Sequence, residues 1–326
     1  MSGPRRPYSH AMRSQPFGNT ALRVSEYGLG CARIGGVFQS NASGFVDLLS
    51  FAFERGITFF DTADMYSQGE SEKLIGKAFR GKRDRIVIAS KAGYCLPARR
   101  QLAGKLKPLL RPVVQLLKIR RDRLPSGSRG KLSQNFSPKY LQGAVEGSLR
   151  RLRTDHLDLL QLHSPPAEVI ERGEWQPALE ELKRQGKIRY YGIAVDDIEA
   201  GLAALRFPEV SSLQFTLSLL EQRAAEVLFP QAGRQGVGGI ARECLGNGLL
   251  AKPADQVDLK ANCSSPEEEA RRVTQLADLR ARADAHQRTL LQDALAYPPK
   301  VPGVSVTLLG ARSIEQLAGL LSATPG

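Results

Sequence analysis

Apolar and polar residues follow two rhythms along this chain: short apolar runs, and longer segments with an apolar residue at every third or fourth position. The first rhythm is typical of buried strands, and the second of helices that pack against them. Eight runs fit the strand pattern, at 25–30, 57–61, 85–90, 157–163, 189–194, 211–215, 237–241 and 304–309. Strands and helices that alternate in this way predict an α/β protein, a (β/α)8 TIM barrel whose active site lies at the carboxyl ends of the strands.

Helix start and stop signals occur between the apolar runs. Ser137 is expected to cap a helix that begins at Pro138, and Gly186 is expected to end another. Two segments interrupt the repeat. Residues 96–136 separate the third strand from its helix, where about two to six residues would be enough. Residues 253–300 are expected to form one long or two shorter charged helices before the last strand.

The length and composition fit one large core. The chain has 326 residues, of which 42% are hydrophobic, and barrels of this length commonly form a single domain. We expect one barrel domain over 21–326, preceded by a flexible basic tail over 1–20. The chain lacks the apolar segment of a secretory signal, and no apolar run reaches the roughly 20 residues that cross a bilayer.

The cysteines favour a reducing, cytoplasmic setting. There are four, widely separated along the chain, at Cys31, Cys95, Cys244 and Cys263. Their spacing fits neither a disulfide framework nor a structural zinc site. No metal ligands are therefore expected.

Most of the positive charge lies in one segment. The formal net charge is +13, and the stretch 96–139 holds twelve Lys or Arg residues against one acid, Asp122, which is +11 of that total. Apolar residues recur there at helical spacing. Residues 96–136 are therefore predicted to form a basic amphipathic insertion, interrupted by Pro108 and Pro112.

Three roles for this insertion stay open. Because it follows the third strand, it is expected to rise from the catalytic face, where it would serve as a lid whose cations attract an anionic substrate. A helix that binds a membrane surface or a partner is the second interpretation, and a solvated packing element is the third. Nucleic acid binding is not expected, because the segment lacks interleaved aromatic residues and any known binding module.

Four polar residues stand at or just beyond the ends of predicted strands. Asp61 closes the second strand, and Tyr66 follows it by five residues. Lys91 closes the third strand, RIVIASK, and His163 closes the fourth. In a barrel these positions face the catalytic end. Each residue taken singly has a structural explanation, such as a turn cap or a lysine that reaches solvent. Their joint occurrence favours an active site, whereas Asp64 is interpreted as a solvated loop acid.

The motifs around these residues resemble the aldo-keto reductases, in particular the bacterial type. They are GITFFDTADMY followed by GESEKLIG, IVIASKAGY, SLRRLRTDHLDLLQLHSPP, GKIRYYGIAVDD and LLGARSIEQL, and they occur in the order found in that family. The resemblance extends over about 22–321. It implies a barrel-shaped oxidoreductase with a catalytic tetrad, matched here by Asp61, Tyr66, Lys91 and His163.

The chemistry of these four residue types suits proton transfer. The pKa of a free tyrosine is about 10, too high for efficient proton donation near neutrality. A neighbouring ammonium lowers that pKa, and a carboxylate keeps the ammonium charged and oriented. Tyr66 is therefore the expected acid, Lys91 its tuner and Asp61 the residue that orients Lys91. His163 is expected to hydrogen-bond the substrate carbonyl.

A nicotinamide cofactor is implied by the same resemblance. No Gly-x-Gly-x-x-Gly turn indicates a Rossmann domain, and the family places the dinucleotide across the barrel top. Gln214 matches the residue that binds the nicotinamide carboxamide, and Arg242 the residue that stacks on the ring. Arg312 and Gln316 lie at a helix N-terminus where a 2′-phosphate can bind, so NADP(H) is favoured over NAD(H). The other expected cofactor-binding positions are Gly30, Ala194, Leu245, Asn247 and Gly310.

Some positions depart from the family pattern. Ala194 and Val195 stand where Ser and Asn are usual, Cys244 replaces a common Pro, and Leu320 replaces an Asn that often contacts adenine. Each lost hydrogen bond would weaken cofactor binding by about 0.5–1.5 kcal/mol. These departures predict a weaker or faster-exchanging cofactor, and loss of cofactor binding is the second alternative.

The sequence thus predicts an NADPH-dependent oxidoreductase that transfers hydride between the nicotinamide and a small carbonyl or alcohol substrate. Reduction of an activated double bond is a related reaction within the same family. The alternative hypothesis is a nucleotide-binding regulatory or scaffold barrel with weak redox activity that docks through its basic insertion. The complete tetrad favours the enzyme, and the departures favour the scaffold.

Overall fold

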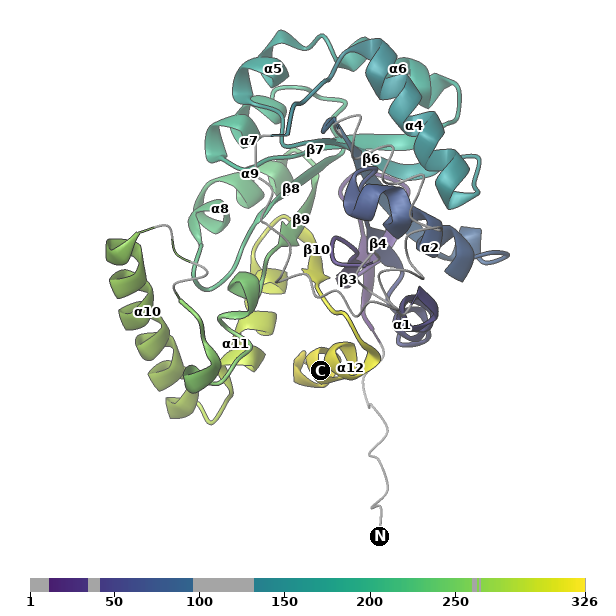
Figure 1. Ribbon diagram of the computed structural model, residues 1–326. Helices are drawn as coiled ribbons and strands as arrows, with labels where there is room; N and C mark the ends of the chain where they lie inside the picture. Colours follow the sequence, from purple (N-terminus) through teal and green to yellow (C-terminus); the bar gives the residue numbers. More distant parts are fainter. Residues whose placement is uncertain (1–11, 35–41, 96–131, 260–262, 264, 326) are drawn as a thin grey trace.

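A closed barrel of parallel strands forms the centre of the molecule (Figure 1). The computed structural model describes residues 12–34, 42–95, 132–259, 263 and 265–325. Its barrel strands are β3 (Tyr27–Gly30), β4 (Phe59–Asp61), β5 (Val87–Ala92), β6 (Leu157–His163), β7 (Ile188–Ala194), β8 (Ser212–Thr216), β9 (Gly238–Arg242) and β10 (Val304–Leu309). They follow one another around the barrel, and β10 closes it against β3. The predicted (β/α)8 fold is therefore confirmed.

Helices surround the strands and shield the barrel from solvent. The described helices are α1 (Ala42–Glu54), α2 (Glu70–Ala78), α4 (Pro138–Leu152), α5 (Ala167–Arg172), α6 (Gln176–Arg184), α7 (Ile198–Ala204), α8 (Arg223–Glu226), α9 (Leu228–Arg234), α10 (Pro266–Ala285), α11 (Leu290–Ala296) and α12 (Ile314–Ala323). The predicted boundaries at Ser137 and Pro138 are confirmed, because they are the N-cap and first residue of α4. The turn after α6 contains Gly186 at a φ of 71°, a left-handed conformation that suits glycine.

An antiparallel hairpin closes the amino-terminal end of the barrel. Strands β1 (Ser14–Pro16) and β2 (Arg23–Ser25) pair with each other, and Phe17 between them is fully buried with its ring centroid 5.9 Å from that of Phe59. Part of the segment predicted as a flexible tail is thus structured. The sequence pattern missed it because each strand is only three residues long.

The barrel interior forms a core of its own. Phe17, Leu22 and Val24 pack there against inward-facing strand residues, namely Phe59, Val87, Ala89, Leu159, Ile240, Val306 and Leu308. Side chains alternate across a strand. The residues two positions after Phe59, Ala89 and Leu159 therefore face the same interior, nearer its carboxyl end. These residues are Asp61, Lys91 and Gln161, and all three are polar.

Helices α10 and α11 stand beside the barrel (Figure 1). For residues 253–300 the sequence predicted one long helix or two shorter ones, and the described part of this segment has two. Each begins with a side-chain cap, at Ser265 and at Thr289. They enclose a small apolar cluster with the loops after β8 and β9, formed by Leu220, Leu249, Leu250, Leu276 and Ala294. In the part of the chain that the structure describes, no helix combines the length and apolarity needed to cross a membrane.

Candidate active site

Lys91 is the centre of a buried polar cluster at the carboxyl end of the barrel. It is the next to last residue of β5, at the end of the strand as predicted. Its Nζ donates to Oδ2 of Asp61 at 2.5 Å, to the carbonyl oxygen of Thr62 at 3.1 Å and to the hydroxyl of Tyr66 at 3.4 Å. The ammonium therefore joins the predicted acid to the predicted orienting carboxylate.

The second carboxylate oxygen of Asp61 is held by two amides. Gln214 donates to Oδ1 at 2.8 Å and Gln161 donates to it at 3.3 Å. Asp61, Gln161 and Gln214 are all buried. Because both oxygens have donors, the carboxylate is fixed in one orientation and can hold the ammonium in place.

Tyr66 and His163 face each other across the same site. Tyr66 begins a 3-10 turn, Tyr66–Gly69, that follows β4. Its ring meets that of His163 edge-on at a centroid distance of 5.8 Å, and Tyr94 meets His163 from another side at 4.8 Å. The Nδ1 atom of His163 is buried and has no hydrogen-bond partner among the residues that the structure describes. All four residues predicted as catalytic thus lie together.

Burial dominates the protonation of this cluster. It raises the pKa of Tyr66, and the charge of Lys91 offsets only part of that rise. The expectation that Lys91 lowers the pKa of Tyr66 below that of a free tyrosine is therefore wrong. Burial lowers the pKa of Lys91, but Asp61 and Tyr66 outweigh it and the net shift is upward. The pKa of His163 lies well below its ordinary value, because of burial and then the charges of Lys91 and Arg242.

Arg242, predicted to stack on a nicotinamide ring, lies at the end of β9. Its guanidinium donates to the carbonyl oxygen of Val195 at 3.1 Å, to Asp196 at 2.5 Å and to Glu243 at 2.8 Å. The side chain thus crosses from β9 to the loop after β7. It is close enough to the cluster to influence the pKa of both Tyr66 and His163.

The remaining predicted cofactor residues lie at the carboxyl ends of their strands or in the loops that follow. Gly30 pairs with Asp61 across β3 and β4, and Ala194 pairs with both His163 and Gln214. Leu245 and Asn247 belong to the loop after β9. Gly310 and Arg312 follow β10, and the side chain of Gln316, in the first turn of α12, accepts a hydrogen bond from the backbone of Arg312.

A cavity of about 170 Å³ lies beside the loop after β9. It is lined by Thr216, Ser218, Leu220, Glu221, Glu243, Gly246, Asn247, Leu249 and Arg272. Its walls come from the loops after β8 and β9 and from α10. Two glutamates face one arginine in this lining, and Arg272 already donates to the carbonyl oxygen of Leu220 at 2.7 Å, so the cavity carries no positive charge that would favour phosphate groups. Of the residues predicted to bind cofactor, Asn247 is one that lines it.

Several residues of the site escaped the sequence interpretation. Gln161 stands two positions before His163 and so faces the same side of β6. The alternation of side chains along the strand could therefore have predicted it. Tyr94 and Asp196 lie in loops, and their contacts depend on how the loops fold. Asp64, interpreted as a solvated loop acid, instead has a buried Oδ1 for which the described part of the chain offers no hydrogen-bond partner. Burial and the nearby Glu72 raise the pKa of Asp64 to about 7.

Only the end of the predicted basic insertion is described, since residues 96–131 lie outside the described residues. Gln134 forms a bridge with Tyr94 and donates from its amide to the carbonyl oxygens of His163 and Ser164, at 3.1 and 2.7 Å. The insertion therefore returns to the barrel at the catalytic face. Its roles as a lid, a membrane contact or a packing element stay predictions.

Comparisons with known proteins agree with this geometry. A model described as Aldo/keto reductase family matches residues 26–324. The uncharacterized oxidoreductase YqkF of Bacillus subtilis is 31% identical over 311 residues, 94% of this chain and 89% of the relative. The holo form of AKR11C1 from Bacillus halodurans is 28% identical with a TM-score of 0.75, over 96% of this chain and 90% of that one. An aldo/keto reductase of Klebsiella pneumoniae, solved with NADP and acetate, is 26% identical with a TM-score of 0.65, over 94% and 88% of the two chains.

Proposed function

Because the chain belongs to the aldo/keto reductase family, we propose that this oxidoreductase reduces small carbonyl compounds with NADPH, using Tyr66 as the general acid. The observation that carries the proposal is the contact of Lys91 with both the Tyr66 hydroxyl, at 3.4 Å, and Asp61, at 2.5 Å. A protonated phenol beside a fixed ammonium is suited to give a proton to an oxygen on which negative charge develops.

The roles of the four residues follow from their protonation. Bound NADPH would supply the hydride to the carbonyl carbon. Tyr66 stays protonated because burial raises its pKa, so it can donate to the carbonyl oxygen. Lys91 then stabilises the phenolate that remains, and Asp61 holds Lys91 in place. His163 stays neutral because its pKa is lowered, so it can donate a hydrogen bond to the carbonyl without adding charge.

The residues around the mouth of the barrel fit a dinucleotide. Gln214 and Arg242 would hold the nicotinamide end, and the loop that contains Leu245 and Asn247 would lie along the rest of the dinucleotide. Arg312, an exposed cation next to the start of α12, would meet the 2′-phosphate of NADPH. The complex of the related Klebsiella enzyme with NADP supports this choice.

Cofactor binding has a structural cost in this chain. The bonds of Arg242 to Asp196 and Val195 fix its guanidinium, so it can stack on a nicotinamide ring only in the orientation that these bonds set. The amide of Gln214 is already bonded to Asp61, and Ala194 offers no side-chain hydrogen bond. We expect affinity for NADPH to be modest and exchange to be fast, a property that the regulatory alternative also requires.

A substrate panel tests the proposal. Purified protein is mixed with NADPH and a series of aldehydes, ketones and sugar-derived carbonyls, and oxidation is followed by absorbance of the reduced nicotinamide. Tyr66→Phe should lower kcat by about 10²-fold or more, and Tyr297→Phe, which removes a phenol outside the site, should not. Turnover that is unchanged in Tyr66→Phe would refute the assignment. Binding of NADPH without turnover of any substrate would favour the regulatory alternative.

Cofactor choice is tested separately with Arg312→Ala. The variant should raise KM for NADPH by about tenfold, because a charge-assisted hydrogen bond to the phosphate is lost. KM for NADH should change little. Equal effects on both cofactors would contradict the assignment of Arg312 to the 2′-phosphate.

A further inference from the structure

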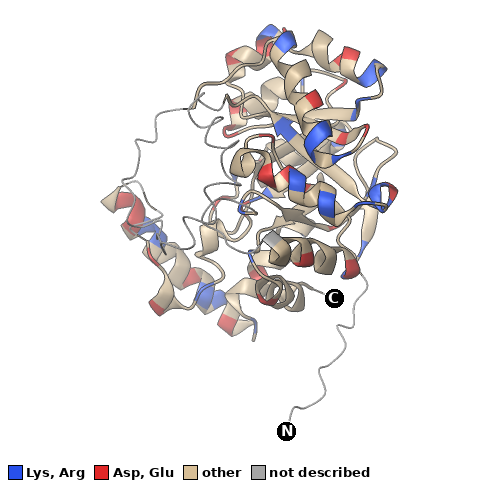
Figure 2. Ribbon diagram, turned by 45° about the vertical axis from the view of Figure 1, so that its right-hand side comes forward, with Lys and Arg blue, Asp and Glu red and all other residues tan. Residues whose placement is uncertain are grey.

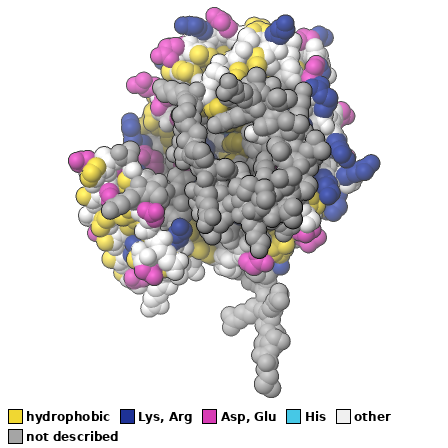
Figure 3. Space-filling model, in the orientation of Figure 1, with side chains coloured by type: hydrophobic (Ala, Val, Ile, Leu, Met, Phe, Trp, Pro, Cys, Tyr) yellow, Lys and Arg dark blue, Asp and Glu magenta, His cyan; other side chains and the backbone are white. Residues whose placement is uncertain are grey.

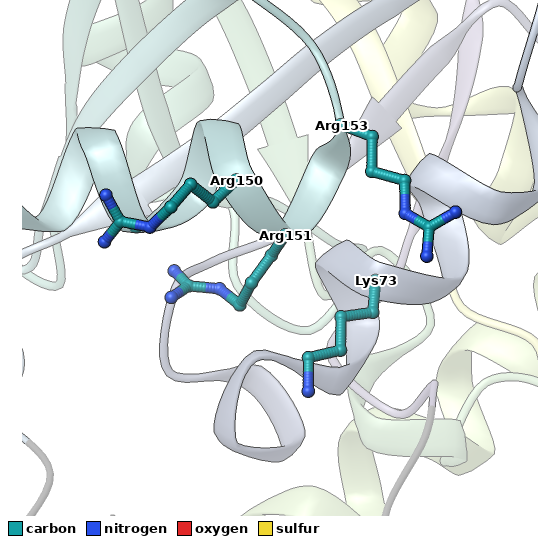
Figure 4. Close-up of a pocket in the computed structure, with 5 residues that line it drawn as sticks. Lys73, Arg150, Arg151 and Arg153 are labelled. Atoms are coloured by element: carbon teal, nitrogen blue, oxygen red, sulfur yellow. The ribbon is translucent and has the colours of Figure 1, made fainter.

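A second pocket lies in the outer helix layer, away from the mouth of the barrel. It has a volume of about 290 Å³ and is lined by Lys73 of α2, by Gly147, Arg150 and Arg151 of α4, and by Arg153 just beyond α4. Figure 4 shows Lys73 and Arg151 extending to the same side of the two helices, with Arg150 and Arg153 on either flank. Positive side chains also gather over α2 and α4 at the right-hand edge of the surface in Figure 3.

The charges that line this pocket are unbalanced. Four of its lining residues are cations and none is an acid. Arg151 has a partner, because its Nε donates to the fully buried Glu72 at 2.6 Å. Within the described part of the chain, Lys73, Arg150 and Arg153 form no ion pair. Glu146, the acid that lies close enough to Arg150 to be influenced by it, binds Lys187 at 2.9 Å.

Two glycines leave room for the Arg151 side chain. A Cβ on Gly69 would lie 2.5 Å from Cδ of Arg151, and a Cβ on Gly147 would lie 3.0 Å from its Nη1. Arg151 also donates to Ser148 at 3.1 Å. Its guanidinium is therefore held in one place, a pre-organised group at the wall of the pocket.

Arg153 occupies a position that would suit glycine. It is the C-cap of α4 and has a left-handed backbone, with a φ of 58°, which is disfavoured for residues with a Cβ. Cations in the last turn of a helix complement its dipole, and this explains Arg150 and Arg151. It does not explain Lys73 on another helix, or an arginine in a left-handed conformation.

The geometry points to a binding site for a small soluble ligand that carries two or more phosphate groups. Guanidinium groups bind phosphate oxygens in a bidentate manner and keep their charge at any physiological pH. The cavity is at the lower end of the size range of ligand pockets. It is a hollow between two helices without an aromatic lining residue, so it suits a compact polyanion better than a nucleic acid strand, whose bases would stack on aromatic rings.

Isothermal titration with inorganic pyrophosphate at low ionic strength tests the site. The wild-type chain should bind it at a single saturable site, more weakly as salt is added. Lys73→Gln and Arg153→Gly should each weaken binding by about fivefold, since each removes a charge-assisted contact. Arg153→Gly also relieves the left-handed backbone, so loss of binding in a variant that folds at least as stably separates charge from fold. Lys77→Gln, one turn along the same helix α2 and outside the pocket, is the matched control.

Three results would overturn the inference. One is the absence of saturable binding at pyrophosphate concentrations up to about 10 mM. Another is binding that the Lys73 and Arg153 variants leave unchanged. The third is binding that Arg312→Ala abolishes instead, since it would place the pyrophosphate at the mouth of the barrel. None of these results depends on turnover of a substrate. The binding site is therefore tested independently of the proposed reductase activity.

Discussion

The Nζ of Lys91 lies 2.5 Å from Oδ2 of Asp61, and the exposed fractions of the two side chains are only 2% and 6%. A buried ion pair contributes little net stability when it is complete, but removal of one partner leaves the other charge buried and uncompensated. The relationship between these two residues therefore governs folding as well as the site.

Asp61→Ala should lower the free energy of unfolding by about 3–5 kcal/mol, as measured by urea denaturation. The reason is that the buried amino group of Lys91 would lose the carboxylate that compensates its charge. The double variant Asp61→Asn with Lys91→Met removes both charges and should recover most of the loss. If the double variant is as unstable as Asp61→Ala, the pair is not the cause.

Stability should fall on acidification because of His163. Its pKa is lowered in the folded chain, so below about pH 6.5 the unfolded chain takes up a proton that the folded chain does not. The stability of the wild type should drop by about 1 kcal/mol more than that of His163→Gln between pH 7.5 and pH 5.5. His286→Gln, which removes an exposed histidine at the end of α10, is the control and should show the wild-type slope.

Asp64→Asn should stabilise the protein, and more so as pH rises. The pKa of Asp64 is raised to about 7, so the folded chain holds a proton between pH 4 and pH 7 that the unfolded chain has lost. The stability that this protonated carboxyl group contributes is therefore complete below about pH 4 and is lost as the pH rises to about 7. The free energy of unfolding of Asp64→Asn should therefore exceed that of the wild type by an amount that grows by about 1–3 kcal/mol from pH 4 to pH 8.

Chemical denaturation at several pH values measures this gain. Asp278→Asn, at an exposed position of α10, should give no gain that grows with pH. A gain for Asp64→Asn that is constant over the whole range would contradict a raised pKa and would indicate a packing effect instead.

Phe17→Ala should destabilise the barrel by about 3–5 kcal/mol, because a fully buried ring would be replaced by a cavity. Thermal unfolding gives the measurement. Arg23→Ala, in the same hairpin but exposed, should change stability by less than about 0.5 kcal/mol. A small effect of Phe17→Ala would show that the hairpin is dispensable for the closure of the barrel.

The sequence alone predicted the barrel and the four central residues because both depend on local pattern. Asp61 and His163 end apolar strands, and in a parallel barrel all strand ends meet on one face. Figure 2 illustrates why charge was less informative: acidic and basic residues are spread over the helices, while the interior strands carry few. The strongly basic segment that stood out in the sequence lies mostly outside the described residues.

The rest of the site depends on contacts between segments that are distant in sequence. The burial of Asp64 requires α2 and α4 to meet, which they do because Gly76 leaves space for the backbone of Leu152. The bond of Gln214 to Asp61 joins residues 153 positions apart. The link of Arg242 to Asp196 likewise depends on how the loop after β7 folds toward the end of β9. No periodicity in the sequence encodes such pairs.

The position of the β1–β2 hairpin, at the amino-terminal end of the barrel, indicates where this protein can be attached to a surface. The described chain starts at Met12, beside Gly56 and at the end of the barrel opposite to Lys91. A tether or a label attached to the side chain of residue 12 would therefore lie at the base. An electrode or bead coupled there would leave the entrance open to reactants, so immobilised protein should retain the accessibility that it has in solution.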